Sequence, residues 1–495
     1  MNDLRISKSQ YLRGIQCPKS LWYYRYKKEL ISEEEPDNMN NLFNAGHEVG
    51  KLAQGYFKNG IEIVAEPYEI EKSIKLTNDA IANRNSVVFE AAASSDDGAY
   101  SKIDIFKKVN DSDEWDLIEV KMSTGVKDYY IDDLALQRYA FLGAGYKIRK
   151  SILMHVNNQY VRSGDLDLKE FFTLMDCTDE VVNKLGEVKN NLSRLFKILK
   201  HDTEPDIGPG DHCCDPFECE FCYHCWPERS EHSVYNIFGK GTKRYNLINA
   251  GIQDIRDIPD DFSLTDREFI AVTATKKKKI VSDKKKIDAF LNDLEYPLYY
   301  LDYETIFPVV PLFDQNKPYQ QIPFQFSLHI QKEKNEDSEH IEFLHIETGD
   351  PRPEFIKALI KACGETGSVV VYNIGFERTR NRELGENFPE YKEALDKISN
   401  RMVDLLIPFR SRFLYHPKMK GSASIKKVLP AFVPELNYDD LEIGDGGTAS
   451  HLYLCCKKNI VSENEKSDIF LNLKKYCYQD TYAEVLLIDT LYKYS

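Results

Sequence analysis

The segment EWDLIEVKMST (114–124) decides which fold we expect for the first half of this 495-residue chain. It has the period-two alternation of a β-strand, in which successive side chains point to opposite faces of the sheet. Glu119 and Lys121 therefore share one face of the predicted strand, while Ile118 and Val120 point to the other face.

Two further strands are predicted upstream of this one. SVVFEAAAS (86–94) contains Glu90, and SKIDIFKKV (101–109) places Asp104 between two isoleucines. Carboxylates on neighbouring strands can bind a hard divalent cation through oxygen. A lysine beside them can orient the attacking water and offset the charge of a phosphate, so the pattern favours metal-dependent phosphodiester hydrolysis.

These residues resemble the RecB-like branch of the PD-(D/E)xK nucleases, which includes the CRISPR-associated RecB-like exonucleases. The resemblance covers residues 5–228 and implies a restriction-endonuclease-like domain there. It implies that the Mg2+ or Mn2+ ligands are His47, Asp104 and Glu119, and that Lys121 is the catalytic lysine. Gln137, in the predicted helix DLALQRYAF, matches the glutamine that positions the lysine or the DNA, and Glu90 lies where related proteins keep an acid.

Cysteines are concentrated in HCCDPFECEFCYHCW (212–226), which holds five of the chain's 11 cysteines; Cys17 stands alone far upstream. A cluster this dense indicates disulfides, structural zinc or an iron–sulfur centre. Neither a secretory signal nor a membrane-spanning apolar run is predicted, so we expect a cytoplasmic protein without membrane association. A reducing compartment disfavours stable disulfides and favours metal binding.

The same nuclease branch often ties its N-terminal cysteine to three C-terminal cysteines through a [4Fe–4S] cluster. The resemblance implies a cluster held by Cys17 and three of the C-terminal cysteines, but the branch's common spacing C-x2-C-x5-C does not single out a set here. We favour the evenly spaced Cys213, Cys219 and Cys225, with Cys214 and Cys222 as spare thiols. A second possible C-terminal set is Cys219, Cys222 and Cys225. Four thiolates hold zinc equally well, and His212 or His224 could contribute, so structural Zn2+ stays open.

The C-terminal half contains a second group of acidic positions. YPLYYLDYETI (296–306) predicts a buried strand on which Asp302 and Glu304 share a face. Glu377 begins a helix after another core strand, and Asp404 follows in MVDLL. Tyr476 and Asp480 lie one helical turn apart near the C-terminus.

This second pattern resembles the RNase H-like, DnaQ-type 3′–5′ exonucleases of the DEDD class. Asp302-x-Glu304 matches the first motif, Asn373 to Glu377 the second, and Tyr476-x3-Asp480 the third. The resemblance implies a two-cation site of Asp302, Glu304, Glu377 and Asp480, with Tyr476 orienting the nucleophile. The second motif usually ends in Asp, so Glu377 departs from the pattern by one methylene.

We therefore expect an α/β protein with three parts. These are a nuclease domain over 1–228, a mainly helical connector over 229–296 that resembles a helix–turn–helix or hairpin element, and an RNase H-like domain over 297–495. The connector carries the densest basic runs, Lys276–Lys279 and Lys284–Lys286. They are either a solvated helix face or a patch that contacts phosphates.

The whole arrangement also resembles an uncharacterised bacterial family with this fusion. The expected function is a metal-dependent nuclease acting on single-stranded or end-bearing DNA, in repair, recombination or antiphage defence. RNA processing is a second enzymatic hypothesis. A metal-stapled protein that binds nucleic acid or assembles with other proteins, with degenerate nuclease sites, is the non-enzymatic alternative. The net charge of −15 disfavours bulk nucleic-acid coating but does not argue against a nuclease.

Overall fold

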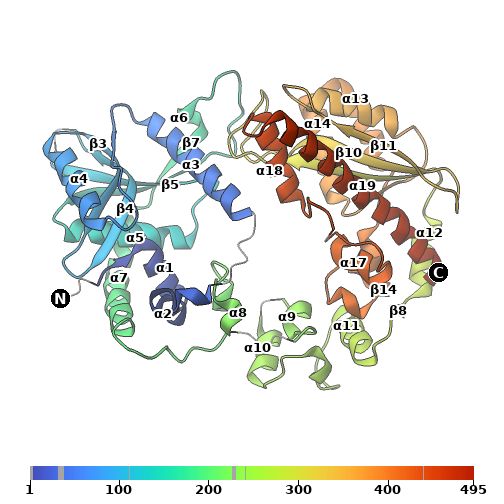
Figure 1. Cartoon of the computed structure of the whole chain (residues 1–495), viewed down its shortest axis with the longest axis horizontal. Coiled ribbons are helices and arrows are strands. Elements are labelled where there is room, and N and C mark those ends of the chain that lie inside the picture. The colour runs from blue at the N-terminus through green and yellow to red at the C-terminus, as the bar shows by residue number, and fades with distance from the viewer. Residues whose placement is uncertain (1–3, 32–37, 111, 226–229, 240, 439) are drawn as a thin grey trace. The chain divides into compact units, whose positions relative to one another are not determined.

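The computed structural model describes residues 4–31, 38–110, 112–225, 230–239, 241–438 and 440–495 (Figure 1). The chain is mixed α/β, which confirms the predicted fold class. It divides into two compact units: Met1–Pro227 with Pro308–Tyr319, and Glu228–Phe307 with Gln320–Ser495. The boundary expected after residue 228 lies outside the described residues.

The first unit is built on a sheet in the order β2-β3-β4-β5-β6-β7, with β1 paired to β4. Its described strands are β1 (Ile6–Ser7), β2 (Ile61–Glu62), β3 (Val87–Ser94), β4 (Ala99–Lys108), β5 (Glu114–Lys121), β6 (Lys147–Val156) and β7 (Phe172–Asp176). Its described helices are α1 (Lys8–Gln16), α2 (Pro18–Tyr26), α3 (Asn38–Tyr56), α4 (Ile70–Ala82), α5 (Asp128–Gly143), α6 (Leu168–Phe171), α7 (Thr178–Ile198) and α8 (Cys222–Cys225).

Strand β5 packs against an apolar core on each face, although half of the residues in its sequence EWDLIEVK are charged. Leu117 packs into the core formed with α5, and Ile118 packs into the core on the other face with α3. β5 pairs antiparallel with β4 and parallel with β6, and α5 makes the crossover that a parallel pair requires. Glu119 and Lys121 follow Leu117 on the α5 side of the sheet.

The second unit contains a sheet in the order β11-β10-β9-β12-β13. Its strands are β9 (Leu298–Ile306), β10 (Ile322–Gln331), β11 (Glu339–Leu344), β12 (Val369–Val371) and β13 (Met402–Asp404), and a separate pair joins β8 (Val281–Ser282) to β14 (Leu414–Tyr415). The described helices are α9 (Val234–Ile237), α10 (Thr242–Asn249), α11 (Asp266–Lys277), α12 (Lys284–Asn292), α13 (Arg352–Ala362), α14 (Gly375–Asn387), α15 (Lys392–Asn400), α16 (Leu406–Arg410), α17 (Ile425–Phe432), α18 (Gly446–Lys457) and α19 (Glu463–Tyr494).

The central strand β9 separates two environments. Tyr299, Leu301 and Tyr303 enter the apolar core that also contains α13 residues. Asp302 and Glu304 therefore point to the opposite face, where α18 and α19 pack on β9. Helix α19 begins with a capping box between Ser462 and Glu465 and extends for 32 residues. Its length carries the C-terminal motif from the protein surface to the middle of the sheet.

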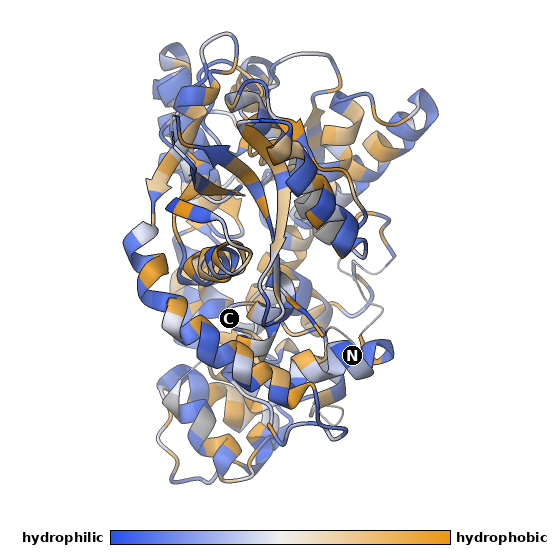
Figure 2. Ribbon diagram, turned by 90° about the vertical axis from the view of Figure 1, so that its left-hand side faces the viewer, coloured by the Kyte–Doolittle hydropathy of each residue, from blue (hydrophilic) through white to orange (hydrophobic). Residues whose placement is uncertain are grey.

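The connector is helical and belongs to the second unit. Helix α10 ends at Asn249, and Gly251 has φ +78°, a backbone conformation that glycine adopts without steric cost. Lys277–Lys279 and Lys284–Lys286 are exposed at the ends of α11 and α12. Figure 2 shows hydrophilic and hydrophobic residues alternating along many helices, as expected where one helix face is buried.

Among the helices that the structure describes, none has both the length and the apolar character needed to cross a membrane.

Candidate functional site

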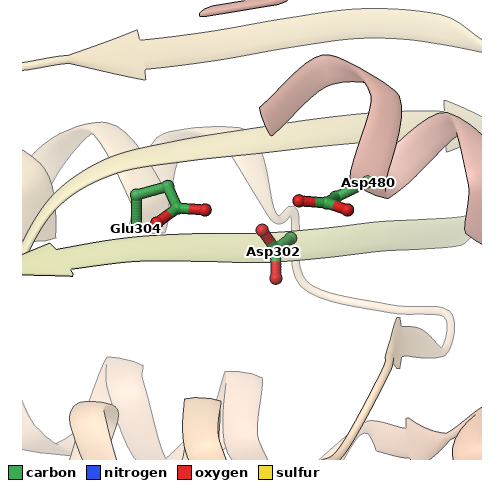
Figure 3. A group of neighbouring side chains, drawn as sticks. All are labelled: Asp302, Glu304 and Asp480. Atoms are coloured by element: carbon green, nitrogen blue, oxygen red, sulfur yellow. The ribbon is translucent and has the colours of Figure 1, made fainter. Parts of the chain in front are cut away.

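Three carboxylates of the second unit come together from two elements that lie far apart in the sequence. Asp302 and Glu304 come from β9 and Asp480 comes from α19, and in Figure 3 their side chains point toward one another. One oxygen from each lies within 4.8 Å of the others, and among the described residues this is the one such group of metal-ligating side chains. Oxygen ligands at this spacing suit Mg2+ or Mn2+.

Burial and mutual repulsion favour the neutral forms of these carboxyl groups. Burial, followed by the neighbouring Asp480, raises the pKa of Asp302 well above its usual value, and burial with Asp302 does the same for Glu304. The pKa of Asp480 is raised by burial to about 6. Like charges in a low-dielectric site disfavour ionisation unless a cation is bound. A bound cation would therefore be electrostatically favourable at this site.

Two tyrosines and one lysine surround Asp480. Tyr438 donates a 2.6 Å hydrogen bond to Asp480 Oδ1, and Tyr476 also lowers the pKa of this carboxyl by hydrogen bonding. Lys426 Nζ lies 5.5 Å from the ring centroid of Tyr476 and lowers the pKa of Asp302, Glu304 and Asp480. Tyr476 is thus placed beside the acidic group, as the resemblance implied.

Glu377 lies in the first turn of α14 and is 2% exposed. Asn373, which precedes this helix, has φ +89°, a left-handed conformation that asparagine tolerates better than most residues. Burial and then Asp302 raise the pKa of Glu377, and its Oε2 has no hydrogen-bond partner among the described residues. The longer side chain therefore still comes within electrostatic range of Asp302.

Glu484 is a further member of this group that sequence reasoning missed. It is 1% exposed, and burial, then Asp302, Glu377 and Asp480, raise its pKa well above the usual value. Neither of its carboxylate oxygens meets hydrogen-bond geometry with a described residue. The available signal was helical spacing, since Tyr476, Asp480 and Glu484 are four residues apart and share a helix face.

Asp404 has a structural role instead. Its Oδ1 accepts hydrogen bonds from the backbone amides of Asn373 and Leu406, at 3.1 and 3.0 Å. It therefore fixes the turn after β12 that leads into α14. Lys426 and Tyr438, which do face the acidic group, had no motif to mark them.

The first unit contains the second acidic group, built around β4 and β5. Lys8 and Lys121 each contact Glu119 Oε1, at 2.6 and 2.9 Å, and Glu119 is 2% exposed. Burial opposes ionisation, but the two lysines lower the pKa of Glu119 to about 2. Burial and then Glu119 raise the pKa of the partly buried Asp104 to about 8. The two carboxyls thus have opposite tendencies to ionise.

Residues of α5 complete this first group. Gln137 donates to Glu119 Oε2 at 2.5 Å and to the carbonyl of Lys102 at 3.0 Å. Asp133, which no motif indicated, forms an ion pair with Lys121 at 2.8 Å. Glu90 on β3 has φ +56° and adds to the negative charge around Asp104. Gln137 therefore orients Glu119, and Asp133 orients Lys121.

His47 lies on α3 and is exposed. Within the described part of the chain it does not form, with Asp104 and Glu119, a group whose ligand atoms lie within 4.8 Å of one another. Its assignment as a metal ligand stays a prediction.

The cysteine stretch lies against the N-terminal helices. Gln16 Nε2 donates to the carbonyls of His212 and Phe217 at 2.7 Å, and the Cys219 thiol contacts Ser20 Oγ at 3.5 Å. Burial raises the pKa of the thiols of Cys17, Cys213 and Cys225. The nearby Cys219 raises each of these three pKa values further.

Cys17 and Cys219 both raise the pKa of Cys213 and of Cys225, so these four thiols are near one another; that they are the ligands stays a prediction. Cys222 is close enough to raise the pKa of Cys213, whereas Cys214 is exposed. No three cysteines of the described chain meet the 4.8 Å spacing. That spacing suits a single zinc ion, since a cubane cluster holds its thiolates further apart.

Comparison with known proteins places similarity on both units. Residues 299–424 match the family described as "Domain of unknown function (DUF2779)", a stretch that includes Asp302, Glu304 and Glu377. Uncharacterized protein MG366 of Mycoplasma genitalium is 28% identical over 215 residues, covering 40% of this chain and 32% of that protein. Its Mycoplasma pneumoniae homolog is 26% identical over 227 residues, 42% of this chain and 34% of the relative.

Uncharacterized protein UU173 of Ureaplasma parvum is 25% identical over 395 residues, covering 72% of this chain and 55% of that protein. The chain thus matches about a third of the length of the two Mycoplasma relatives and about half of the Ureaplasma relative.

Proposed function

We propose that this protein is a metal-dependent nuclease, with its better-formed active site in the second unit. The observation that carries the proposal is the convergence of Asp302, Glu304 and Asp480 within 4.8 Å. Such a site is typical of phosphodiester hydrolysis with two cations, which would stabilise the attacking and leaving oxygens when bound. The strand-and-helix origin of these carboxylates supports the RNase H-like, DEDD assignment of this unit.

The chain's own residues supply the remaining functions. Tyr476 lies beside the carboxylates and can orient the nucleophilic water by its hydroxyl. Lys426 offsets part of the negative charge, which lowers the repulsion between the carboxylates and a phosphodiester. Burial of Glu304 and Asp480 excludes bulk water and strengthens these interactions. We propose single-stranded or end-bearing DNA as the substrate, because both resembled nuclease groups include end-processing exonucleases.

The first unit is proposed as a second nuclease site of the RecB-like, restriction-endonuclease-like type. Asp104 and Glu119 would bind Mg2+ or Mn2+, with His47 as the expected additional ligand, and Lys121 would position the water. A specific observation favours a degenerate binding module instead. Lys8 and Lys121 already neutralise Glu119 in this structure, and both contact the same carboxylate oxygen.

The cysteines are proposed to hold a structural [4Fe–4S] cluster through Cys17, Cys213, Cys219 and Cys225, with zinc as the alternative. The donor set fits either group, because four thiolates suit both. The role we propose is to fasten the N-terminal helices to the end of the first unit.

The decisive experiment measures degradation of 3′- and 5′-labelled single-stranded DNA with Mn2+. We compare the full-length protein with Asp302→Asn, Lys121→Ala and the double variant, with RNA of the same sequence as a parallel substrate. Loss of cleavage in Asp302→Asn supports the second-unit site, and preferred RNA cleavage that Asp302→Asn removes supports RNA processing. Wild-type protein that cleaves neither substrate would refute the enzymatic proposal.

A further inference from the structure

A pocket of about 690 Å³ lies within the second unit, and none of the proposed metal ligands lines it. It is lined by parts of the connector, of the strand exits and of the turn before α17; its charged lining residues are Arg267, Glu268, Arg410 and Arg412. Glu268 is already paired with Lys243 at 2.7 Å. Arg410 lies 3.7 Å from Asp404, so Arg267 and Arg412 are the residues that leave the pocket with a net positive charge.

Arg412 is the lining residue that most favours the binding of an anion in this pocket. It is only 9% exposed, and its Nη1 has no hydrogen-bond partner among the described residues. Its guanidinium carbon lies 5.1 Å from the ring centroid of Tyr415, and its backbone has φ +58°. Burying a guanidinium with an unsatisfied donor is costly, because arginine stays charged. An anion in the pocket would offset that cost.

The start of α17 opens on the same pocket. Ser424 and Ile425 line it, and the Ser424 side chain caps none of the first-turn amides of this eight-residue helix. Free amides at a helix N-terminus attract phosphate groups. Gly421 holds the preceding turn against the connector, since a Cβ there would lie 2.3 Å from the Asn236 carbonyl oxygen. The connector thus fixes one wall of the pocket.

The pocket adjoins the acidic group through two short segments. Ser424 and Ile425 line the pocket, while the next residue, Lys426, lowers the pKa of Asp302 and Glu304. Tyr372 and Asn373 also line the pocket, and Asn373 lies four residues before Glu377 in the sequence. These segments connect the pocket with the acidic group, and a nucleic-acid strand held at the carboxylates would place a further phosphate in the pocket by following them.

We propose that this pocket binds a phosphate group of the nucleic-acid strand adjacent to the scissile one, with Arg412 as its main contact. The inference rests on the proposed nuclease function and names how its substrate is held. Tyr372, which is partly buried in the lining, offers one aromatic ring on which a base could stack.

Binding, measured apart from cleavage, tests the proposal. Fluorescence anisotropy of a labelled single-stranded oligonucleotide is recorded at several salt concentrations with full-length Asp302→Asn protein in Mg2+. Adding Arg412→Gln should weaken binding about tenfold and reduce the slope of log Kd against log salt by about one. Arg412→Lys should restore part of the affinity. The matched control is Arg382→Gln, because Arg382 is 62% exposed on α14; its affinity should not change.

Inorganic phosphate and a 5′-mononucleotide serve as competitors that distinguish a free phosphate source from a strand. Loss of mononucleotide binding in Arg412→Gln, with oligonucleotide affinity unchanged, would overturn the proposal and assign a small-molecule site. Where Arg412→Gln fails to fold by circular dichroism, Arg267→Gln with Arg410→Gln replaces it, because both side chains are more exposed. If binding depends on Arg412 but the wild-type protein cleaves nothing, the nuclease proposal is refuted and the phosphate pocket is retained. If the protein cleaves DNA and Arg412→Gln changes neither cleavage nor binding, the pocket proposal is refuted and the nuclease is retained.

Discussion

Tyr438 donates a 2.6 Å hydrogen bond to Asp480, across 42 residues of sequence. The bond joins the segment before α18 to the carboxylate of α19 that faces Asp302 and Glu304. It favours the charged form of Asp480 in a site where burial favours the neutral form. The protonation of this group therefore depends on a residue outside the recognised motifs.

Tyr438→Phe should raise the pKa of Asp480 above its value of about 6, because the charged form loses a donor. Mn2+ binding then needs a higher pH, so its affinity should fall about tenfold at pH 6 and change little at pH 8.5. Titration calorimetry across pH measures this. The control is Tyr478→Phe, because Tyr478 lies on α19 with Asp480 but is 41% exposed. Equal pH profiles for the wild type and both variants would contradict the role of Tyr438 at Asp480.

Mn2+ should stabilise the wild-type protein more at pH 8 than at pH 5, since protons compete for the same carboxylates. A concentration one hundred times Kd corresponds to about 2.7 kcal/mol. Thermal unfolding should show the increase in wild type and in Glu386→Gln, whose side chain is 63% exposed. Asp302→Asn and Glu304→Gln should lose most of it. An undiminished increase in both variants would place the cation elsewhere.

Glu484→Met should stabilise the cation-free protein at pH 8 by about 1–3 kcal/mol, because a buried carboxylate among other acidic groups is replaced by an apolar side chain of similar volume. The pKa of Glu484 is raised in the folded state, so the folded protein binds more protons than the unfolded chain. Its penalty grows as pH rises, and the difference between the variants should shrink toward pH 5. Urea unfolding in EDTA at both pH values measures this, and lower stability of Glu484→Met at pH 8 would show that the carboxylate is stabilising.

Lys121→Ala should destabilise the first unit by about 2–4 kcal/mol, because Asp133, 3% exposed, loses its ion-pair partner. Lys150→Ala is the matched control: Lys150 and Asp176 pair at 2.9 Å with both side chains more than 40% exposed, so its cost should stay below about 1 kcal/mol. In an Asp302→Asn background, Lys121→Ala should also lower residual DNA cleavage at least about a hundredfold. Residual cleavage that persists unchanged would support the binding-module alternative for this unit.

Cys17→Ser should remove the bound metal and lower the thermal midpoint, whereas Cys214→Ser should retain both, because Cys214 is exposed. Iron, sulfide and zinc analysis with visible spectroscopy after anaerobic purification identifies the group. A brown wild-type protein supports iron–sulfur, and a colourless protein with stoichiometric zinc supports the alternative. Metal content that is equal in wild type and Cys17→Ser would exclude Cys17 as a ligand.

Local periodicity was sufficient to place several residues correctly. The period of two on β9 placed Asp302 and Glu304 on one face, and the helical period placed Tyr476 beside Asp480 on α19. It also predicted the mixed α/β class and a helical connector. These features depend on neighbours within one strand or one helix, so a single sequence contains them.

Only the tertiary structure decided which charges meet. Lys8 reaches Glu119 across 111 residues, and Lys426, Tyr438 and Glu484 reach the acidic group without any motif. Whether a carboxyl ionises depends on its burial and on the distance to charges from other elements, as the opposite shifts of Asp104 and Glu119 demonstrate. The sequence by itself determined which side chains each strand and helix presents on a common face; folding determined the distances between those faces, and electrostatic energy depends on distance and dielectric environment.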